Sequence, residues 1–226
     1  MEEKIKNGIT ELVFILDKSG SMGGMEKDTI GGFNSMIQKQ KKENTNALVT
    51  TVIFDDKIDI IHDRIKIENV PTLTDKEYFA RGCTALLDAV GTTIKHISNI
   101  HKYIKEDDVP GKTLFIITTD GYENASKEYD VSKVKSMIED KKSNHNWEFL
   151  YLGADIDAVD EAQKIGIESD YAATIMKDRQ GMDVFYQTIS DVVCCKSKML
   201  NDTKLDKNWK FQIDDDFKKR NKSTKK

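Results

Sequence analysis

The sequence contains no apolar run of about 18 residues, the length that predicts a membrane-spanning helix. Its first residues, MEEKIKNGITELVF, begin with acidic side chains and lack the basic and then apolar pattern of a secretory signal. Cysteine is scarce: Cys83 stands alone, and Cys194 and Cys195 are adjacent, which does not suit a disulfide framework. These absences predict a cytoplasmic protein with reduced thiols.

An excess of basic charge is also missing. The chain has 35 Lys and Arg residues against 39 Asp and Glu residues, which gives a formal net charge of −4. A nucleic-acid-binding domain usually carries a basic face, so this balance disfavours nucleic acid as the main partner. The exception is FKKRNKSTKK, residues 217–226, in which six of ten residues are basic. Contact with nucleic acid or anionic lipid through this run is kept as an alternative.

Motifs for two common kinds of site are absent. The segment SGSMGGM lies between a predicted strand and a predicted helix, but a dinucleotide fingerprint would need glycine in place of Met22 and Met25. A serine hydrolase needs a histidine base and a nucleophile elbow, and no such elbow is recognisable near any of the four histidines. The sequence therefore offers no catalytic residue, and we predict that the protein is not an enzyme.

What the sequence does contain is an alternation of apolar strands and amphipathic helices. Near-continuous apolar runs are typical of parallel strands covered on both faces, and they occur at residues 11–17, 47–56, 112–120 and 147–155, with a weaker one at 171–176. Residues 58–67 follow the second run so closely that only a hairpin fits, which predicts an antiparallel edge strand. Helical periodicity is clearest over residues 182–199, which should pack on the sheet as the closing helix.

Strands that alternate with helices predict an α/β fold, a three-layer, doubly wound, Rossmann-like sandwich with helices on both faces. We expect a mostly parallel six-stranded sheet in the order 3-2-1-4-5-6, with the third strand antiparallel at one edge. One domain should span residues 8–200. The polar, basic residues 201–226 are expected to form a flexible tail.

Oxygen-bearing side chains follow or precede three of the predicted elements. Asp17, Ser19 and Ser21 come at the end of the first strand, Asp120 ends the strand at 112–120, and Thr84 precedes a helix. In an open α/β sheet, ligands bind outside the carboxyl ends of the strands. Each fragment alone could be a turn or a helix cap. Together they predict an oxygen-rich cup that suits a hard cation such as Mg²⁺.

Three motifs resemble the metal-ion-dependent adhesion site of von Willebrand factor type A (vWA) domains: DxSxS at residues 17–21, GxTxLxDA at 82–89 and TDG at 119–121. The resemblance covers roughly residues 10–199. It implies that Mg²⁺, with Mn²⁺ or Ca²⁺ as alternatives, is held by Asp17, Ser19, Ser21, Thr84 and Asp120. It further implies an intracellular, metal-dependent protein–protein interaction module, in which an Asp or Glu carboxylate of the partner completes the metal site. Bacterial intracellular relatives are often linked to AAA+ ATPases, so such an ATPase is one candidate partner.

A Mg²⁺-dependent phosphohydrolase with an aspartyl nucleophile is the alternative, since it too places aspartates after the first and fourth strands. Such enzymes resemble D-x-D-x-T, in which the second aspartate is a general acid, and that position is Ser19 in this chain. A hydroxyl of ordinary pKa cannot protonate a leaving group as a carboxylic acid does. The phosphohydrolase therefore ranks second.

Overall fold

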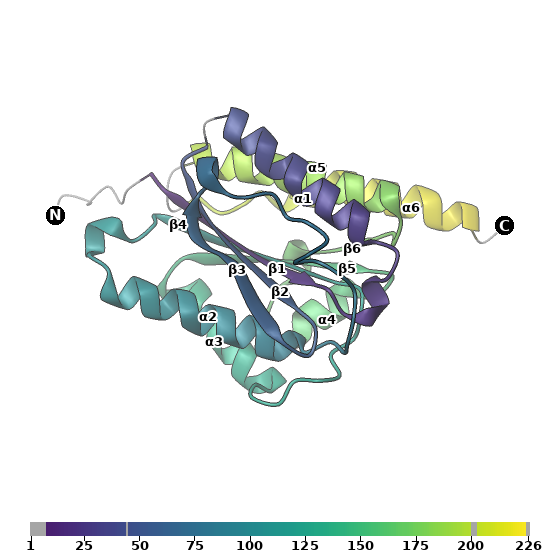
Figure 1. Cartoon of the computed structure of the whole chain (residues 1–226), viewed down its shortest axis with the longest axis horizontal. Helices are drawn as coiled ribbons and strands as arrows, with labels where there is room; N and C mark the ends of the chain where they lie inside the picture. The colour runs from purple at the N-terminus through teal and green to yellow at the C-terminus, as the bar shows by residue number, and fades with distance from the viewer. Residues whose placement is uncertain (1–7, 44, 200–202, 225–226) are drawn as a thin grey trace.

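A six-stranded sheet lies between two layers of helices in the computed structural model, which describes residues 8–43, 45–199 and 203–224 (Figure 1). The strand order is β3-β2-β1-β4-β5-β6. The strands are β1 (Thr10–Asp17), β2 (Ala47–Phe54), β3 (Ile58–Lys66), β4 (Lys112–Thr119), β5 (Trp147–Ala154) and β6 (Ala172–Ile175). Each neighbouring pair is parallel except β2 and β3. The predicted fold class and strand order are confirmed.

β1 occupies the middle of the sheet because its side chains can be buried in both directions. All eight of its residues are buried, as are all eight of β5. Phe14 and Leu16 face one helical layer, and Val13 and Ile15 face the other. A strand with no polar face is stable only between two covered faces, so its apolar run dictates its central position.

β3 is the antiparallel edge strand that the hairpin spacing predicts. His62 is the one buried residue of this strand. The register with β2 shifts on both sides of Thr51, and Arg64 in β3 has a φ of 49°. Bulges and charged side chains on an edge strand discourage pairing with another chain.

The helices divide between the two faces of the sheet (Figure 1). One core contains residues of α1 and α5, and the other contains residues of α2, α3 and α4. The helices are α1 (Glu26–Lys42), α2 (Leu86–Tyr103), α3 (Val131–Asn144), α4 (Ala158–Lys164), α5 (Arg179–Lys198) and α6 (Phe211–Thr224). Short 3₁₀ turns are η1 (Gly20–Met22), η2 (Ile67–Asn69), η3 (Glu106–Asp108), η4 (Ser169–Tyr171) and η5 (Lys207–Lys210). The closing helix predicted at 182–199 corresponds to α5, whose apolar side chains pack into the first core.

The C-terminal segment differs from the sequence interpretation, which expected a polar tail and no helix. η5 and α6 lie there, and Ile213 is only 2% exposed. The Trp209 indole donates a hydrogen bond from Nε1 to the carbonyl oxygen of Asp170 at 2.9 Å. Only a few apolar side chains anchor this segment. Because they stand among many charged residues, the sequence shows little helical periodicity there. The predicted boundary at residue 200 falls outside the described residues and stays a prediction.

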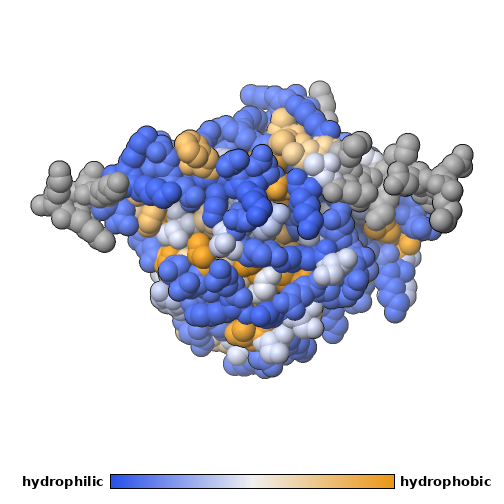
Figure 2. All heavy atoms as spheres, turned by 180° about the vertical axis from the view of Figure 1, so that it is seen from behind, coloured by the Kyte–Doolittle hydropathy of each residue, from blue (hydrophilic) through white to orange (hydrophobic). Residues whose placement is uncertain are grey.

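The surface is mostly polar. Figure 2 shows the rear face as largely hydrophilic, with small and separate apolar patches. Over the described ranges, no helix is both long enough and apolar enough to cross a bilayer.

Candidate metal site

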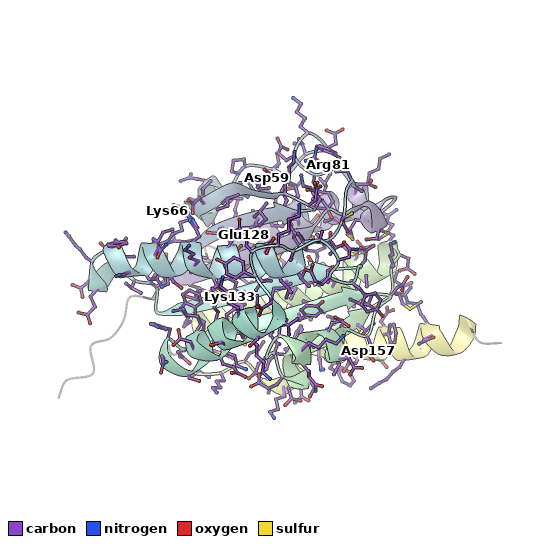
Figure 3. All side chains as sticks on the ribbon, turned by 90° about the horizontal axis from the view of Figure 1, so that it is seen from below. Asp59, Lys66, Arg81, Glu128, Lys133 and Asp157 are labelled. Carbon is purple, nitrogen blue, oxygen red and sulfur yellow. The ribbon has the colours of Figure 1, made fainter. Side chains whose placement is uncertain are left out.

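The predicted oxygen-rich residues lie where the strand order reverses, between β1 and β4. Asp17 is the last residue of β1, and Asp120 directly follows β4. From β1 the sheet continues to β2 on one side and to β4 on the other, which makes this point the topological switch of the fold. In Figure 3, the labelled Arg81 and Asp157 lie toward this end of the molecule, whereas Lys66 lies toward the other.

Asp17 is held rigidly at the floor of the cup. Its Oδ1 accepts a hydrogen bond from the Ser19 backbone nitrogen at 2.6 Å, and its Oδ2 accepts one from Thr119 Oγ1 at 2.6 Å. Its backbone carbonyl oxygen accepts a hydrogen bond from the Tyr78 hydroxyl. Because both carboxylate oxygens have fixed partners, Asp17 presents its charge in one orientation.

A chain of hydroxyls joins the β1 loop to the end of β4. Ser21 Oγ donates to Asp120 Oδ1 at 2.5 Å, and Ser19 Oγ lies 2.9 Å from Ser21 Oγ. A serine has one hydroxyl proton, so Ser21, which gives its proton to Asp120, accepts from Ser19. Both hydroxyl oxygens retain a lone pair that a cation could use.

Thr84 enters from the loop before α2. Its backbone nitrogen donates to Asn124 Oδ1 at 2.9 Å, and its carbonyl oxygen accepts from the Asn124 nitrogen at 3.0 Å. A Cβ atom placed on Gly121 would lie 2.8 Å from Thr84 Oγ1 and 3.3 Å from Ser21 Oγ, so these two hydroxyls border one small space. The structure therefore brings together all the side chains named from the sequence, and their role as metal ligands stays a prediction: Asp17, Ser19, Ser21, Thr84 and Asp120.

Backbone contacts dock the Thr84 loop onto the β1 loop. The Gly20 nitrogen donates to the Gly82 carbonyl oxygen at 3.1 Å, and the Arg81 nitrogen donates to the Lys18 carbonyl oxygen at 2.9 Å. Gly82 has a φ of +68°, and a Cβ atom on it would lie 2.4 Å from Asp56 Oδ1. The left-handed backbone favours glycine here, whereas the exposed Asp56 side chain could rotate away from a larger residue.

The aspartate of the GxTxLxDA motif has a structural role outside the cup. The Asp88 carboxylate accepts hydrogen bonds from the backbone nitrogens of residues 127–129. Glu123 acts similarly, since its Oε2 accepts from the Leu87 nitrogen at 2.8 Å. These carboxylates tie the loop after β4 to the start of α2 and so fix Thr84 and Asp120 relative to each other.

Burial shapes the electrostatics of the cup. Desolvation raises the pKa of Asp17, the hydrogen bonds from Thr119 and Ser19 oppose that rise, and the nearby charge of Asp120 adds to it. Asp17 is 1% exposed, and the side chain of Asp120 is fully buried. Two buried carboxylates in one place repel each other, and a cation would relieve that repulsion.

Sequence reasoning missed Lys177, which lies between β6 and α5. Its Nζ donates to the Ser21 carbonyl oxygen at 2.6 Å and lies 2.9 Å from Asp120 Oδ2. The ammonium is thus the ion-pair partner of the buried Asp120 Oδ2. No motif marks this lysine in the sequence, because only the fold brings it to Ser21, 156 residues earlier in the chain.

The donor set fits a hard divalent cation. It offers only carboxylate and hydroxyl oxygens, the ligand type that Mg²⁺ prefers. In the described ranges, no three His, Cys, Asp or Glu side chains gather as a metal-binding group, which agrees with a cup in which most donors are hydroxyls. Asp120 Oδ2 is a buried anionic oxygen that already lies 2.9 Å from one cation, the Lys177 ammonium, so its position suits a cationic neighbour.

Comparisons with known proteins support the fold. No protein-family model matches the chain, and no curated protein matches it. A solved von Willebrand factor type A structure from Catenulispora acidiphila is 15% identical with a TM-score of 0.55, and the match covers 83% of this chain and 42% of that one. The vWF domain of the type V pili tip protein Mfa5 from Porphyromonas gingivalis is 10% identical with a TM-score of 0.58, over 87% of this chain and 98% of that one.

A third similar structure is that of proximal thread matrix protein 1 from the mussel byssus, with 12% identity and a TM-score of 0.59. The match covers 84% of this chain but only 49% of the mussel chain, so this chain spans about half the length of that protein. At these identities the likeness shows the fold alone. The chain has the fold of vWA domains.

Proposed function

We propose that this protein is an interaction module that binds a carboxylate of a partner protein through Mg²⁺ held by Asp17, Ser19, Ser21, Thr84 and Asp120. The observation that carries the proposal is the convergence of these side chains, from three loops, on one buried cup at the switch point of the sheet. Domains of the vWA fold are typically protein-interaction modules, and solved vWA structures are similar to this chain.

The chemistry of the cup supports binding rather than turnover. A bound Mg²⁺ would supply a Lewis-acidic coordination position for an acidic side chain of the partner. Three neutral hydroxyls among the donors leave more of the charge of the cation uncompensated than carboxylates would. Asp17, already engaged by Ser19 and Thr119, contributes orientation and charge.

Neither alternative gains support from the contacts. The place of the general acid in a phosphohydrolase is taken by Ser19, whose hydroxyl is bonded to Ser21. That the protein is not an enzyme stays a prediction.

For the basic run, Arg220 pairs with Asp178 and Asp216, and Lys219 pairs with Asp215. Acidic neighbours therefore neutralise part of the charge that a nucleic acid or an anionic lipid would need.

Titration calorimetry with Mg²⁺ and Mn²⁺ tests the proposal. The intact protein should bind metal, and Asp17→Ala or Asp120→Ala should abolish binding while leaving the fold largely intact, because both residues lie at strand ends rather than in an apolar core. Ser19→Ala should weaken binding more mildly, since water can replace a neutral ligand. Asp160→Ala, an exposed carboxylate in the first turn of α4, is the matched control and should bind as the wild type does.

Two results would contradict the proposal. Absence of metal binding by the intact protein would remove its basis. Hydrolysis of a generic phosphoester, lost in Asp17→Ala, would favour the phosphohydrolase instead.

A pull-down with and without chelator would identify the partner. Binding of the partner should require both the metal and Asp120. The identity of the captured partner also tests the AAA+ ATPase, and location in the cytoplasm is a further part of the proposal.

A further inference from the structure

The loop that carries Lys177 is braced on both sides. The Lys177 backbone nitrogen donates to Asp155 Oδ1 at 3.2 Å, and the Asp155 nitrogen donates to the Ile175 carbonyl oxygen at 3.2 Å. On the other side, Asp178 caps α5 by accepting from the Gly181 nitrogen and also pairs with Arg220 of α6. The lysine side chain is therefore directed into the cup from a fixed backbone.

The ammonium group of Lys177 occupies the Asp120 side of the cup. Its Nζ lies 2.9 Å from Asp120 Oδ2 and 2.6 Å from the Ser21 carbonyl oxygen. The two carboxylate oxygens of Asp120 thus have different partners: Oδ1 accepts a hydrogen bond from Ser21, and Oδ2 lies beside Lys177. The Lys177 side chain is 28% exposed, so the ammonium lies at the mouth of the cup and can withdraw into solvent.

The position of Lys177 determines the net charge of the cup. Asp17 and Asp120 bring two negative charges to the cup, and Lys177 offsets one of them. A divalent cation near Asp120 would be repelled by the ammonium, or would have to displace it, and unit charges a few ångströms apart interact strongly in a partly buried site. With Lys177 in place, a metal-loaded cup carries a net positive charge, which the carboxylate of a partner would neutralise.

We propose that Lys177 is a built-in cation that competes with the divalent metal for Asp120 and thereby sets the metal affinity of the cup. In the metal-free chain it neutralises Asp120, so the fold does not depend on metal. It also couples the two ligands: metal alone binds weakly against the ammonium, and a carboxylate from a partner restores the charge balance, so metal and partner bind cooperatively. The competition with metal and the coupling to the partner rest on the function proposed above.

Calorimetric titration with Mg²⁺ alone tests the competition. Lys177→Met keeps the length of the side chain and removes its charge, and it should bind Mg²⁺ at least tenfold more tightly than the wild type. Lys177→Arg keeps the positive charge that opposes the metal, so its Mg²⁺ affinity should stay within about threefold of the wild type. Lys164→Met removes an exposed lysine of α4 that pairs with Glu161, and it serves as the matched control. Equal or weaker Mg²⁺ affinity in Lys177→Met would overturn the proposal.

Thermal unfolding in EDTA gives a second readout that does not need metal binding. Lys177→Met should unfold at a lower temperature than the wild type, because Asp17 and Asp120 lose their neutralising cation, whereas Lys164→Met should not. If no variant binds metal, the proposed function fails, and this measurement still decides the role of the ammonium. An unchanged midpoint for Lys177→Met in EDTA would overturn that role.

Discussion

Gly121 decides how much room the cup has. Its backbone nitrogen lies 3.2 Å from Thr119 Oγ1, and its own Cα faces the space that Thr84 and Ser21 border. Its φ is not in the left-handed region, so a larger residue would be opposed by the neighbouring hydroxyls rather than by the backbone. The space of the candidate site therefore depends on the absence of one methyl group.

We predict that Gly121→Ala weakens Mg²⁺ binding at least tenfold. The new methyl group would lie 2.8 Å from Thr84 Oγ1 and would push that hydroxyl from its place. The free energy of unfolding should fall by about 1–3 kcal/mol, as for other overpacked contacts. Gly8→Ala, where a Cβ meets nothing within 4 Å, is the control. Calorimetry and urea unfolding separate the two effects, and unchanged metal affinity would refute the prediction.

The side chains that support the cup escaped sequence reasoning for physical reasons. Thr119 is the threonine of the TDG motif and the last residue of β4, but the motif does not show that its hydroxyl donates a hydrogen bond to Asp17. Tyr78 lies in a loop without periodicity, and nothing local shows that its hydroxyl reaches the Asp17 carbonyl oxygen. Motifs predicted the ligand candidates, whereas the contacts that support these candidates are defined only by the folded chain.

Among the elements, α1 and α5 pack tightly against each other where Gly32 of α1 meets the ring of Tyr186 in α5. A Cβ atom on Gly32 would lie 2.1 Å from the Tyr186 ring, whereas on the adjacent Gly31 it would meet nothing within 4 Å. Farther along, Gln40 Nε2 donates to the Ser190 carbonyl oxygen at 2.9 Å. Close packing at Gly32, buried hydrogen bonds from Gln40 and an ion pair between Lys39 and Asp191 thus hold the two helices together.

The adjacent glycines give a matched pair of substitutions. Gly32→Ala should lower the free energy of unfolding by about 1–3 kcal/mol, because an overpacked contact forces the helices apart. Gly31→Ala should leave it unchanged or raise it by about 0.5–1 kcal/mol, since alanine favours a helix over glycine. Urea denaturation measures both. Equal effects at the two positions would mean that α1 and α5 are not in close contact.

Elements with continuous or strongly periodic apolar side chains could be predicted from the sequence. The run at 11–17 is β1 (Thr10–Asp17), and the periodic stretch at 182–199 is α5 (Arg179–Lys198). α6 could not be predicted, because its anchor Ile213 stands among charged residues and its position depends on packing against α5 and β6. The start of α5 at Arg179 was likewise missed, since Asp178 sets it by capping rather than by periodicity.

At the scale of the whole molecule, the candidate metal site exists only when distant segments meet. Its residues lie between positions 17 and 120, with Lys177 beyond them, and the unfolded chain does not bring them together. A ligand that binds only the folded state stabilises it, by about 2.7 kcal/mol at a concentration 100 times its dissociation constant. Metal binding should therefore raise the free energy of unfolding of the protein.

We predict that saturating Mg²⁺ raises the urea midpoint of unfolding relative to EDTA without changing the slope of the transition, and that Asp120→Ala abolishes the gain. The gain should shrink as the pH falls, since burial raises the pKa of Asp17 above its ordinary value of 3.8 and a protonated carboxyl binds metal poorly. In EDTA the contribution of Asp17 has the opposite sign. The folded chain holds that proton more tightly than the unfolded chain, so stability is lost as the pH rises through the raised pKa. The same gain in Asp120→Ala would place the metal elsewhere.

The central position of β1 also has a consequence for synthesis on the ribosome. One edge of β1 pairs with β2, which follows soon after it, but the other edge waits for β4, where Thr10 is paired with Lys112. At about 5–20 residues per second, the translation of the intervening chain takes several seconds. During that time a sheet of β1, β2 and β3 would expose an apolar strand with unpaired backbone groups. We expect this half-made sheet to be the stage at which the nascent chain most needs protection from mispairing.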